Sequence, residues 1–323
     1  MPAESSLAPS APLSRLVLGT AWLATGVALP GVVRGTQARA LLDLALDLGI
    51  SALDTAAFYQ LGGSERLIGD WMRSAGVRER VYLISKGGHP SLLGRARLAR
   101  GDLERDIDAS LRRLRTDRLE LYLLHRDAPD APLEPIAETL WSFVASGRVR
   151  AYGVSNWTHE RFAALRGLAM SSRQPPPAAS SPQFSLPRWI ATPYPGCVSI
   201  GGPAGAAALR AYRAADASIL AWSPLGGGWL RAPGGRARGR AYRGAGNDAR
   251  HNRLTALAER MGCTPAQLGL AWVLAHGRNV HAIVGTRRPH RLAELPVALE
   301  LSLSAEQISW LANGGQTAPV ADS

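Results

Sequence analysis

Four polar side chains of the types used in proton transfer lie at or just after short apolar runs of the chain. Asp54 ends the run ISALD, Lys86 follows VYLIS, and His125 follows LELYLL. Tyr59 comes five residues after Asp54, in the segment that follows the first of these runs. Lys86 is the only lysine among 37 basic residues, and every other one is an arginine. This position therefore favours an ammonium over a guanidinium.

An ammonium beside a phenol has a definite chemical use. A tyrosine hydroxyl has a pKa of about 10, and a cation at about 4 Å in an effective dielectric of about 20 contributes about 4 kcal/mol, or roughly three pKa units. Lys86 could therefore bring Tyr59 near neutrality, and Asp54 would keep a buried Lys86 protonated. Lysine offers a compact charge where arginine brings a broad planar fork. We predict that Lys86 acts on Tyr59 and that His125 orients a substrate oxygen by hydrogen bonding.

The apolar runs alternate with helical patterns along the whole chain. Alternating strands and helices predict a parallel sheet that is buried on both faces, and eight such units close into a (β/α)8 TIM barrel of about 250 residues. The strands are expected over 15–19, 50–54, 81–85, 119–124, 150–154, 181–185, 218–222 and 280–284. In such a barrel the active site lies at the carboxyl ends of the strands, where the four polar residues fall. A doubly wound open sheet is the alternative, but the turn after the first strand lacks the motif G-x-G-x-x-G.

Local signals mark two helix starts and one long connection. Ser64 is expected to cap a helix over 64–76, and Thr264 is expected to cap a helix over 264–277, with Pro265 at its first position. The Gly/Arg-rich segment 225–252 predicts a long irregular excursion. It is either a basic lid over an anionic ligand or an ordinary exposed insertion.

Composition and charge limit the class of protein. The formal net charge is +12, but the arginines are scattered through helical stretches, which favours a solvated surface over a nucleic-acid partner. A phosphorylated cofactor would suit the same charge. Two lone cysteines, Cys197 and Cys263, predict a reducing compartment and no metal site. Without a signal-type or membrane-spanning run, we expect a cytoplasmic protein with one domain over 13–312, a tail over 1–12 and another over 313–323.

With Asp54, Tyr59, Lys86 and His125 identified, the chain resembles the aldo-keto reductase family from about Leu13 to about Leu311. Several independent motifs occur in the family's order. They are GISALDTAAFY with GGSERLIG, ISKGG, DLERDIDASLRRLRTDRLELYLLHRD, YGVSNW, AWSPLGGG and AIVGTRRPHRLAEL. The resemblance implies a (β/α)8 barrel that reduces an aldehyde or ketone, without a metal, through a tetrad of Asp54, Tyr59, Lys86 and His125.

The resemblance also implies a nicotinamide cofactor and the residues that bind it. Ser155, Asn156 and Gln183 would hold the carboxamide, and Trp222 would stack on the ring. The full cofactor set is Gly19, Thr20, Ser155, Asn156, Gln183, Trp222, Ser223, Leu225, Gly226, Gly285, Arg287, Arg288, Arg291 and Glu294. The three arginines favour NADPH over NADH, because guanidinium groups match the geometry of a 2′-phosphate.

Three departures from the family pattern accompany the resemblance. Leu295 stands where an adenine-contacting asparagine is common, and Trp222 replaces a more usual tyrosine. Only Pro12 to Ser14 separate the rest of the expected tail from the first strand, so a hairpin that closes the barrel bottom is expected to be missing.

The pocket is expected to draw on aromatic residues near strand ends, which suggests an apolar or aromatic carbonyl substrate. These residues are Trp22, Phe58, His89, Trp157 and Trp189. About half of these tryptophans are expected to pack between barrel and helices instead. Three alternatives remain: a Schiff-base aldolase that uses Lys86, a nucleotide-sensing regulatory subunit, and a reductase of an imine or unsaturated intermediate. The sequence leaves the oligomeric state open.

Overall fold

The eight long-range strands of the protein close into a parallel barrel. The computed structural model describes residues 11–25, 31–91, 93–231 and 239–315. Around the barrel the strands run in the order β1-β10-β9-β8-β7-β6-β5-β4, and β4 pairs with β1. Their bounds are β1 Leu16–Gly19, β4 Ala52–Asp54, β5 Tyr82–Gly87, β6 Leu119–Leu124, β7 Val149–Ser155, β8 Ala179–Ser181, β9 Ser218–Trp222 and β10 Val280–Val284. The predicted (β/α)8 barrel is confirmed.

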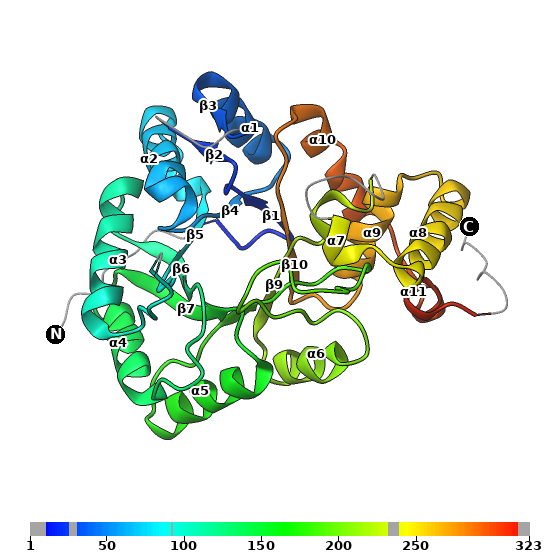
Figure 1. The fold of residues 1–323 in the computed structure, drawn as a ribbon. Coiled ribbons are helices and arrows are strands. Elements are labelled where there is room, and N and C mark those ends of the chain that lie inside the picture. The colour runs from blue at the N-terminus through cyan, green and yellow to red at the C-terminus, as the bar shows by residue number, and fades with distance from the viewer. Residues whose placement is uncertain (1–10, 26–30, 92, 232–238, 316–323) are drawn as a thin grey trace.

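Helices cover the outside of the barrel (Figure 1). They are α1 Gly35–Asp47, α2 Gly63–Ala75, α3 Arg100–Leu114, α4 Leu133–Ala145, α5 His159–Ser171, α6 Gly205–Ala214, α7 Gly239–Tyr242, α8 Ala245–Arg260, α9 Pro265–Leu274, α10 Pro289–Ala293 and α11 Ala305–Asn313. The 3-10 turns are η1 Tyr59–Gly62, η2 Arg78–Arg80, η3 Gly226–Gly228 and η4 Leu295–Leu299. Beside the barrel, β2 Leu23–Ala24 pairs with β3 Val33–Arg34.

The two-residue repeat of a strand decides which side chains face the barrel interior. The interior is packed with small and branched side chains, namely Val17, Ala52, Ile84, Leu121, Leu123, Ala179, Leu220 and Ile283. Asp54, Lys86 and His125 each follow one of these residues by two positions. They therefore lie on the inner face at the carboxyl end of the barrel, where polar side chains replace the apolar filling.

The two predicted helix starts have different outcomes. Thr264 caps α9 in a capping box with Gln267, and Pro265 is the first helical residue, as predicted. The prediction for Ser64 is wrong, because α2 begins at Gly63 after a left-handed Gly62. The Ser64 hydroxyl is buried inside the first turn, close to the carbonyls of Thr20 and Leu23, and it holds α2 against the segment after β1.

The sixth barrel strand lies earlier than predicted, at Ala179–Ser181 in place of 181–185. Pro182 has no N–H group and ends the ladder. Beyond it, Gln183 forms single bridges with Ser199 and Trp222. The chain therefore leaves the barrel wall just before Gln183 and still keeps that side chain near the carboxyl end of β9.

The segment 225–252 is more regular than the sequence suggests. It contains η3, α7 and the first half of α8, so the expectation of an irregular excursion is wrong for 239–252. Residues 232–238, which form the centre of the expected lid, lie outside the described residues. The expected tails, 1–12 and 313–323, also lie mostly outside them, because the described chain runs from 11 to 315.

The barrel bottom is closed by side chains. Residues 11–15 contain no strand, and residues 1–10 lie outside the described residues, so the expected absence of a hairpin stays a prediction. Leu13 packs against the interior cluster, and the Ser14 carbonyl lies 3.0 Å from Nδ1 of His281. The guanidinium of Arg15 donates to the carbonyls of Leu274, Gly277 and Val280.

Within the described ranges, no helix has both the length and the apolar character that a bilayer crossing requires.

Close packing of α2 on the end of α3 yields a stability prediction. A Cβ added at Gly69 would lie 2.7 Å from the Leu114 carbonyl carbon and would overlap the Arg113 carbonyl oxygen. Gly69→Ala is expected to lower the free energy of unfolding by about 1–3 kcal/mol through overpacking, as measured by urea denaturation. Gly167→Ala on α5, where a Cβ meets nothing within 4 Å, should raise it by about 0.5–1 kcal/mol. Equal effects at the two sites would contradict the assigned packing.

Candidate active site

The carboxyl ends of three adjacent strands bring the four predicted residues together. Asp54 is the last residue of β4, Lys86 lies near the end of β5, and His125 directly follows β6. Tyr59 begins η1 in the connection from β4 to α2. Since β4, β5 and β6 are neighbours in the barrel, their ends form one continuous patch of its rim.

Lys86 is the centre of this cluster. Its Nζ lies 2.6 Å from Oδ1 of Asp54, 3.0 Å from the Thr55 carbonyl and 3.3 Å from the Tyr59 hydroxyl. The exposed fractions of Asp54 and Lys86 are only 2% and 3%. An ammonium has three donors, and all three have an acceptor here. The charge is therefore fixed in position and aimed at the phenol oxygen.

The backbone after β4 holds Tyr59 over the lysine. The N–H of Ala57 donates to the Lys86 carbonyl at 2.9 Å, and the N–H of Tyr59 donates to the Ala56 carbonyl at 3.0 Å. Gln60, Leu61 and Gly62 then adopt left-handed backbone conformations in succession. This turn reverses the chain into α2 directly behind the tyrosine, so the ring stays at the rim.

The pKa directions confirm part of the predicted electrostatics. Burial lowers the pKa of Lys86, but Asp54 and Tyr59 outweigh this effect and raise the pKa above its usual value. Burial raises the pKa of the Tyr59 phenol, and the Lys86 ammonium offsets only part of that rise. The expectation that Lys86 brings the phenol near neutrality is thus wrong for the chain alone. Tyr59 keeps its proton at neutral pH and can donate it.

His125 is a neutral imidazole on the other side of Tyr59. Burial lowers the pKa of His125 well below its usual value, and the charges of Lys86 and Arg126 lower it further. Its Nδ1 is buried and has no hydrogen-bond partner among the described residues. The rings of Tyr59 and His125 meet edge to face, with 5.6 Å between their centroids. A neutral ring beside the phenol can donate a hydrogen bond to an oxygen bound between them.

A buried carboxylate behind the site escaped the sequence analysis. Glu65 on α2 is fully buried, and its two oxygens accept hydrogen bonds from Ser85 at 2.6 Å and from Nε of Arg113 at 2.6 Å. Ser85 precedes Lys86 on β5 and points outward, so this network anchors the strand that carries the lysine. The signal was available in the sequence, because Glu65 shares a helix face with Ile68 and Met72, which are also buried.

The residues expected at the nicotinamide ring lie together and already contact one another. The Asn156 amide nitrogen donates to Ser155 Oγ and to the His125 carbonyl, and its oxygen accepts from the Trp222 indole N–H at 3.1 Å. Gln183 accepts a hydrogen bond from Ser199 and donates one to Ser185. A carboxamide bound here would have to replace some of these partners. Tyr242, which sequence reasoning missed, accepts from the Trp189 indole at 3.0 Å.

The residues expected at the phosphates lie after β9 and β10. Ser223 and Gly226 both have left-handed backbones and turn the chain sharply, and Leu225 packs against the core. Arg231 pairs with Glu294 at 2.7 Å and ties this turn to the end of α10. Gly285 adjoins Gly19 across the ends of β10 and β1. Thr20 is buried, and its hydroxyl donates to the Asp54 carbonyl at 3.0 Å.

The arginines expected at the adenosine end form one cationic cluster. Burial lowers the pKa of Arg291, and the charges of Arg231, Arg288 and Arg287 lower it further. Its Nε is a buried donor without a partner among the described residues. Arg287 donates to the Gly31 carbonyl at 2.8 Å. An orphaned guanidinium donor among like charges fits a phosphate ligand.

Four of the five expected pocket residues have part of their surface exposed. Trp22 and Phe58 are each 41% exposed, and His89 and Trp189 are partly buried. The Phe58 ring stacks on the His89 ring, with 3.7 Å between the ring centroids, and the His89 ring meets the His125 ring edge to face, with 5.0 Å between the centroids. Trp157 is different, because it is fully buried in the core beneath Arg161. The expectation that Trp157 lines the pocket is therefore wrong, and it packs between barrel and helix.

Comparison with known proteins agrees with this fold. The model of the aldo/keto reductase family matches residues 15–313. The chain belongs to this family and is an oxidoreductase. It is 34% identical over 274 residues to a 6-dehydroglucose reductase of Novosphingobium aromaticivorans, covering 82% of this chain and 81% of that protein.

Two further relatives support the assignment. The chain is 30% identical over 286 residues to the aldo-keto reductase yakc [NADP(+)] of Schizosaccharomyces pombe, covering 82% of this chain and 78% of that protein. It also resembles the crystal structure of a thermostable aldo-keto reductase in complex with the inhibitor epalrestat. The TM-score is 0.71 and the identity 27%, over 94% of this chain and 95% of that one.

The neutral histidines predict a loss of stability in mild acid. Burial lowers the pKa of His125, and also that of His89, His251, His276 and His281. Below about pH 6.5 these histidines are protonated in the unfolded chain but stay neutral in the folded chain. The free energy of unfolding should therefore fall by up to about 1.4 kcal/mol for each such histidine and each pH unit of acidification. Urea denaturation between pH 7 and pH 5 measures this slope.

A matched pair of variants isolates the contribution of the active site. His125→Gln should reduce the slope by about one proton, whereas Gln174→Asn, which changes no titratable group at an exposed position, should leave it unchanged. An identical slope in wild type and His125→Gln would show that His125 is protonated in the folded state.

Proposed function

We propose that this protein reduces an aldehyde or ketone to an alcohol with NADPH, and that Tyr59 is the general acid. The observation that carries this proposal is the position of Lys86, whose ammonium contacts Asp54, Thr55 and Tyr59 within 3.3 Å in a buried site. Such a fixed cation is useful to a reaction that develops negative charge on an oxygen next to the phenol.

Each residue of the tetrad has one role in this proposal. When bound, the reduced nicotinamide supplies the hydride to the carbonyl carbon. Tyr59 donates its proton to the carbonyl oxygen, which becomes the alcohol hydroxyl. Lys86 stabilises the phenolate that Tyr59 becomes when it gives up its proton, and Asp54 keeps Lys86 charged. Neutral His125 hydrogen-bonds the substrate oxygen and orients the carbonyl.

The same cluster argues against the aldolase alternative. A Schiff-base lysine attacks with an unprotonated amine, whereas here Asp54 and Tyr59 raise the pKa of Lys86. A nucleotide-sensing subunit remains the second candidate, supported by the arginines after β10. Reduction of an imine would keep the same cofactor site and change only the substrate.

The exposed aromatic rim supports an apolar or aromatic carbonyl compound as substrate. Trp22 and Phe58 present open ring surface, and Leu61, which lines the same pocket as Phe58, is 80% exposed. A sugar aldehyde is the second substrate class, because one relative is named a 6-dehydroglucose reductase. Cofactor oxidation with a panel of aromatic and sugar aldehydes separates the two.

Removal of the Tyr59 hydroxyl tests the proton donor. Tyr59→Phe should lower kcat for the best panel substrate by about 10²–10⁴-fold, since general acid catalysis contributes that much, while the Kd for NADPH stays constant. Tyr82→Phe, at the opposite end of the strand that carries Lys86, is the matched control and should keep full activity. Unchanged turnover in Tyr59→Phe, with NADPH still bound, would favour the sensor subunit.

Neutralisation of the arginine cluster tests the cofactor. Arg288→Gln with Arg291→Gln should weaken NADPH binding by about tenfold or more and leave NADH binding nearly unchanged, because charge-assisted bonds to the 2′-phosphate are lost. Fluorescence titration of both cofactors measures this, with exposed Arg210→Gln as the control. Equal affinity of the wild type for the two cofactors would refute the proposed role of these arginines.

A further inference from the structure

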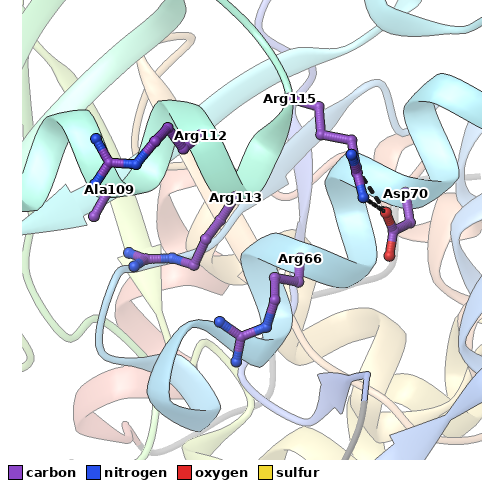
Figure 2. Close-up of a pocket in the computed structure, with 6 residues that line it drawn as sticks. All are labelled: Arg66, Asp70, Ala109, Arg112, Arg113 and Arg115. Atoms are coloured by element: carbon purple, nitrogen blue, oxygen red, sulfur yellow. Dashed lines mark hydrogen bonds and ion pairs between the residues drawn. The ribbon is translucent and has the colours of Figure 1, made fainter.

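A second arginine-rich site lies on the outer surface of the barrel, between α2 and α3. It is a pocket of about 330 Å³ lined by Arg66, Asp70, Ala109, Arg112, Arg113 and Arg115 (Figure 2). Four guanidinium groups thus line a hollow that contains a single carboxylate. None of these residues has a role in the proposed reaction, and α2 and α3 are distinct from the segments that carry the cofactor arginines.

The positive charge of this pocket is only partly neutralised by the protein. Arg115 pairs with Asp70 at 2.7 Å, and Arg113 pairs with Glu65 at 2.6 Å. The Arg66 guanidinium donates only to the Leu61 carbonyl, at 3.2 Å, and the Arg112 guanidinium has no hydrogen bond or ion pair within the described part of the chain. Two guanidinium groups therefore face the pocket without an acidic partner.

The arrangement of these side chains is suited to one ligand. Figure 2 shows the guanidinium groups of Arg66, Arg112 and Arg113 extending to the same side, while Arg115 turns toward Asp70. Arg113 is the most fixed of the three, because its Nε is held by fully buried Glu65. Its terminal nitrogens have no hydrogen bond or ion pair among the described residues, so they can bind a ligand. The site therefore combines one anchored guanidinium with two adaptable ones.

We propose that this pocket binds a small anion with two phosphate groups. Planar guanidinium groups bind phosphate oxygens in pairs, and three of them can share the charge of a diphosphate. A monovalent carboxylate would leave part of the charge uncompensated. An extended nucleic acid would need a long basic stripe, whereas these arginines gather around one open pocket between two helices.

The site has a direct structural connection to the active site. The Arg113 side chain lies against Gly62, which ends the left-handed turn after Tyr59, and a Cβ at Gly62 would lie 2.6 Å from Cδ of Arg113. Arg113 also lines a neighbouring pocket of about 370 Å³ that contains Phe58 and His89. Arg113 therefore contacts the turn three residues after Tyr59, and an anion held by Arg113 would lie next to this turn.

Titration calorimetry with inorganic pyrophosphate tests the proposal on the full chain, at saturating NADP+. The wild type is expected to bind pyrophosphate, and Arg66→Gln with Arg112→Gln should weaken the binding by about tenfold or more, because two charge-assisted interactions are lost. Arg166→Gln with Arg210→Gln, on α5 and α6, is the matched control. It removes the same charge from other helices and should leave the affinity unchanged.

Three results would overturn the proposal. They are the absence of pyrophosphate binding both with and without NADP+, an equal loss of affinity in both double variants, and binding that occurs without NADP+ but is lost in the wild type at saturating NADP+. The last would place the anion on the cofactor arginines. Since Arg66 and Arg112 lie outside the catalytic cluster, a failure here leaves the proposed reductase intact. Conversely, a failure of Tyr59→Phe to lower turnover leaves the anion site intact.

Discussion

The buried ion pair between Lys86 and Asp54 is the constraint on which the active site depends. Taking two charges out of water is costly, and it is tolerated only when their donors and acceptors are satisfied. Here the ammonium has three acceptors within 3.3 Å, supplied by a carboxylate, a backbone carbonyl and a phenol. If any one of them moved, a buried charge would lose a partner. The pair therefore fixes β4, β5 and the Tyr59 loop relative to one another.

Much of this arrangement could be predicted from the sequence, because strand periodicity and barrel geometry act on the same residues. Asp54, Lys86 and His125 follow interior residues by two positions, and closure of the barrel brings their strand ends together. The start of α9 could be predicted for a similar reason, because its N-cap Thr264 and its first helical residue Pro265 are adjacent in the sequence. Strand periodicity and helix caps are visible in short stretches of sequence, and closure of the barrel then brings the ends of the strands close together.

Other features depend on contacts that no local pattern contains. Trp157 is an aromatic residue near a strand end, as a pocket residue would be, but it is fully buried beneath Arg161 of α5. Ser64 resembles a cap, although its hydroxyl lies against carbonyls about forty positions earlier in the chain. The net shift of the Tyr59 pKa could not be inferred either, because it is the balance of burial against Lys86. Such balances depend on the depth of the site, which only the assembled barrel defines.

The hydrogen bond from the Trp222 indole to the Asn156 amide oxygen has a consequence for ligand binding. Under the proposed function, a nicotinamide carboxamide would compete with this indole for the Asn156 amide oxygen. Binding of the carboxamide would then cost this bond, a net penalty of about 1 kcal/mol. The indole would thus act as an internal competitor that lowers the affinity of the site for the proposed cofactor.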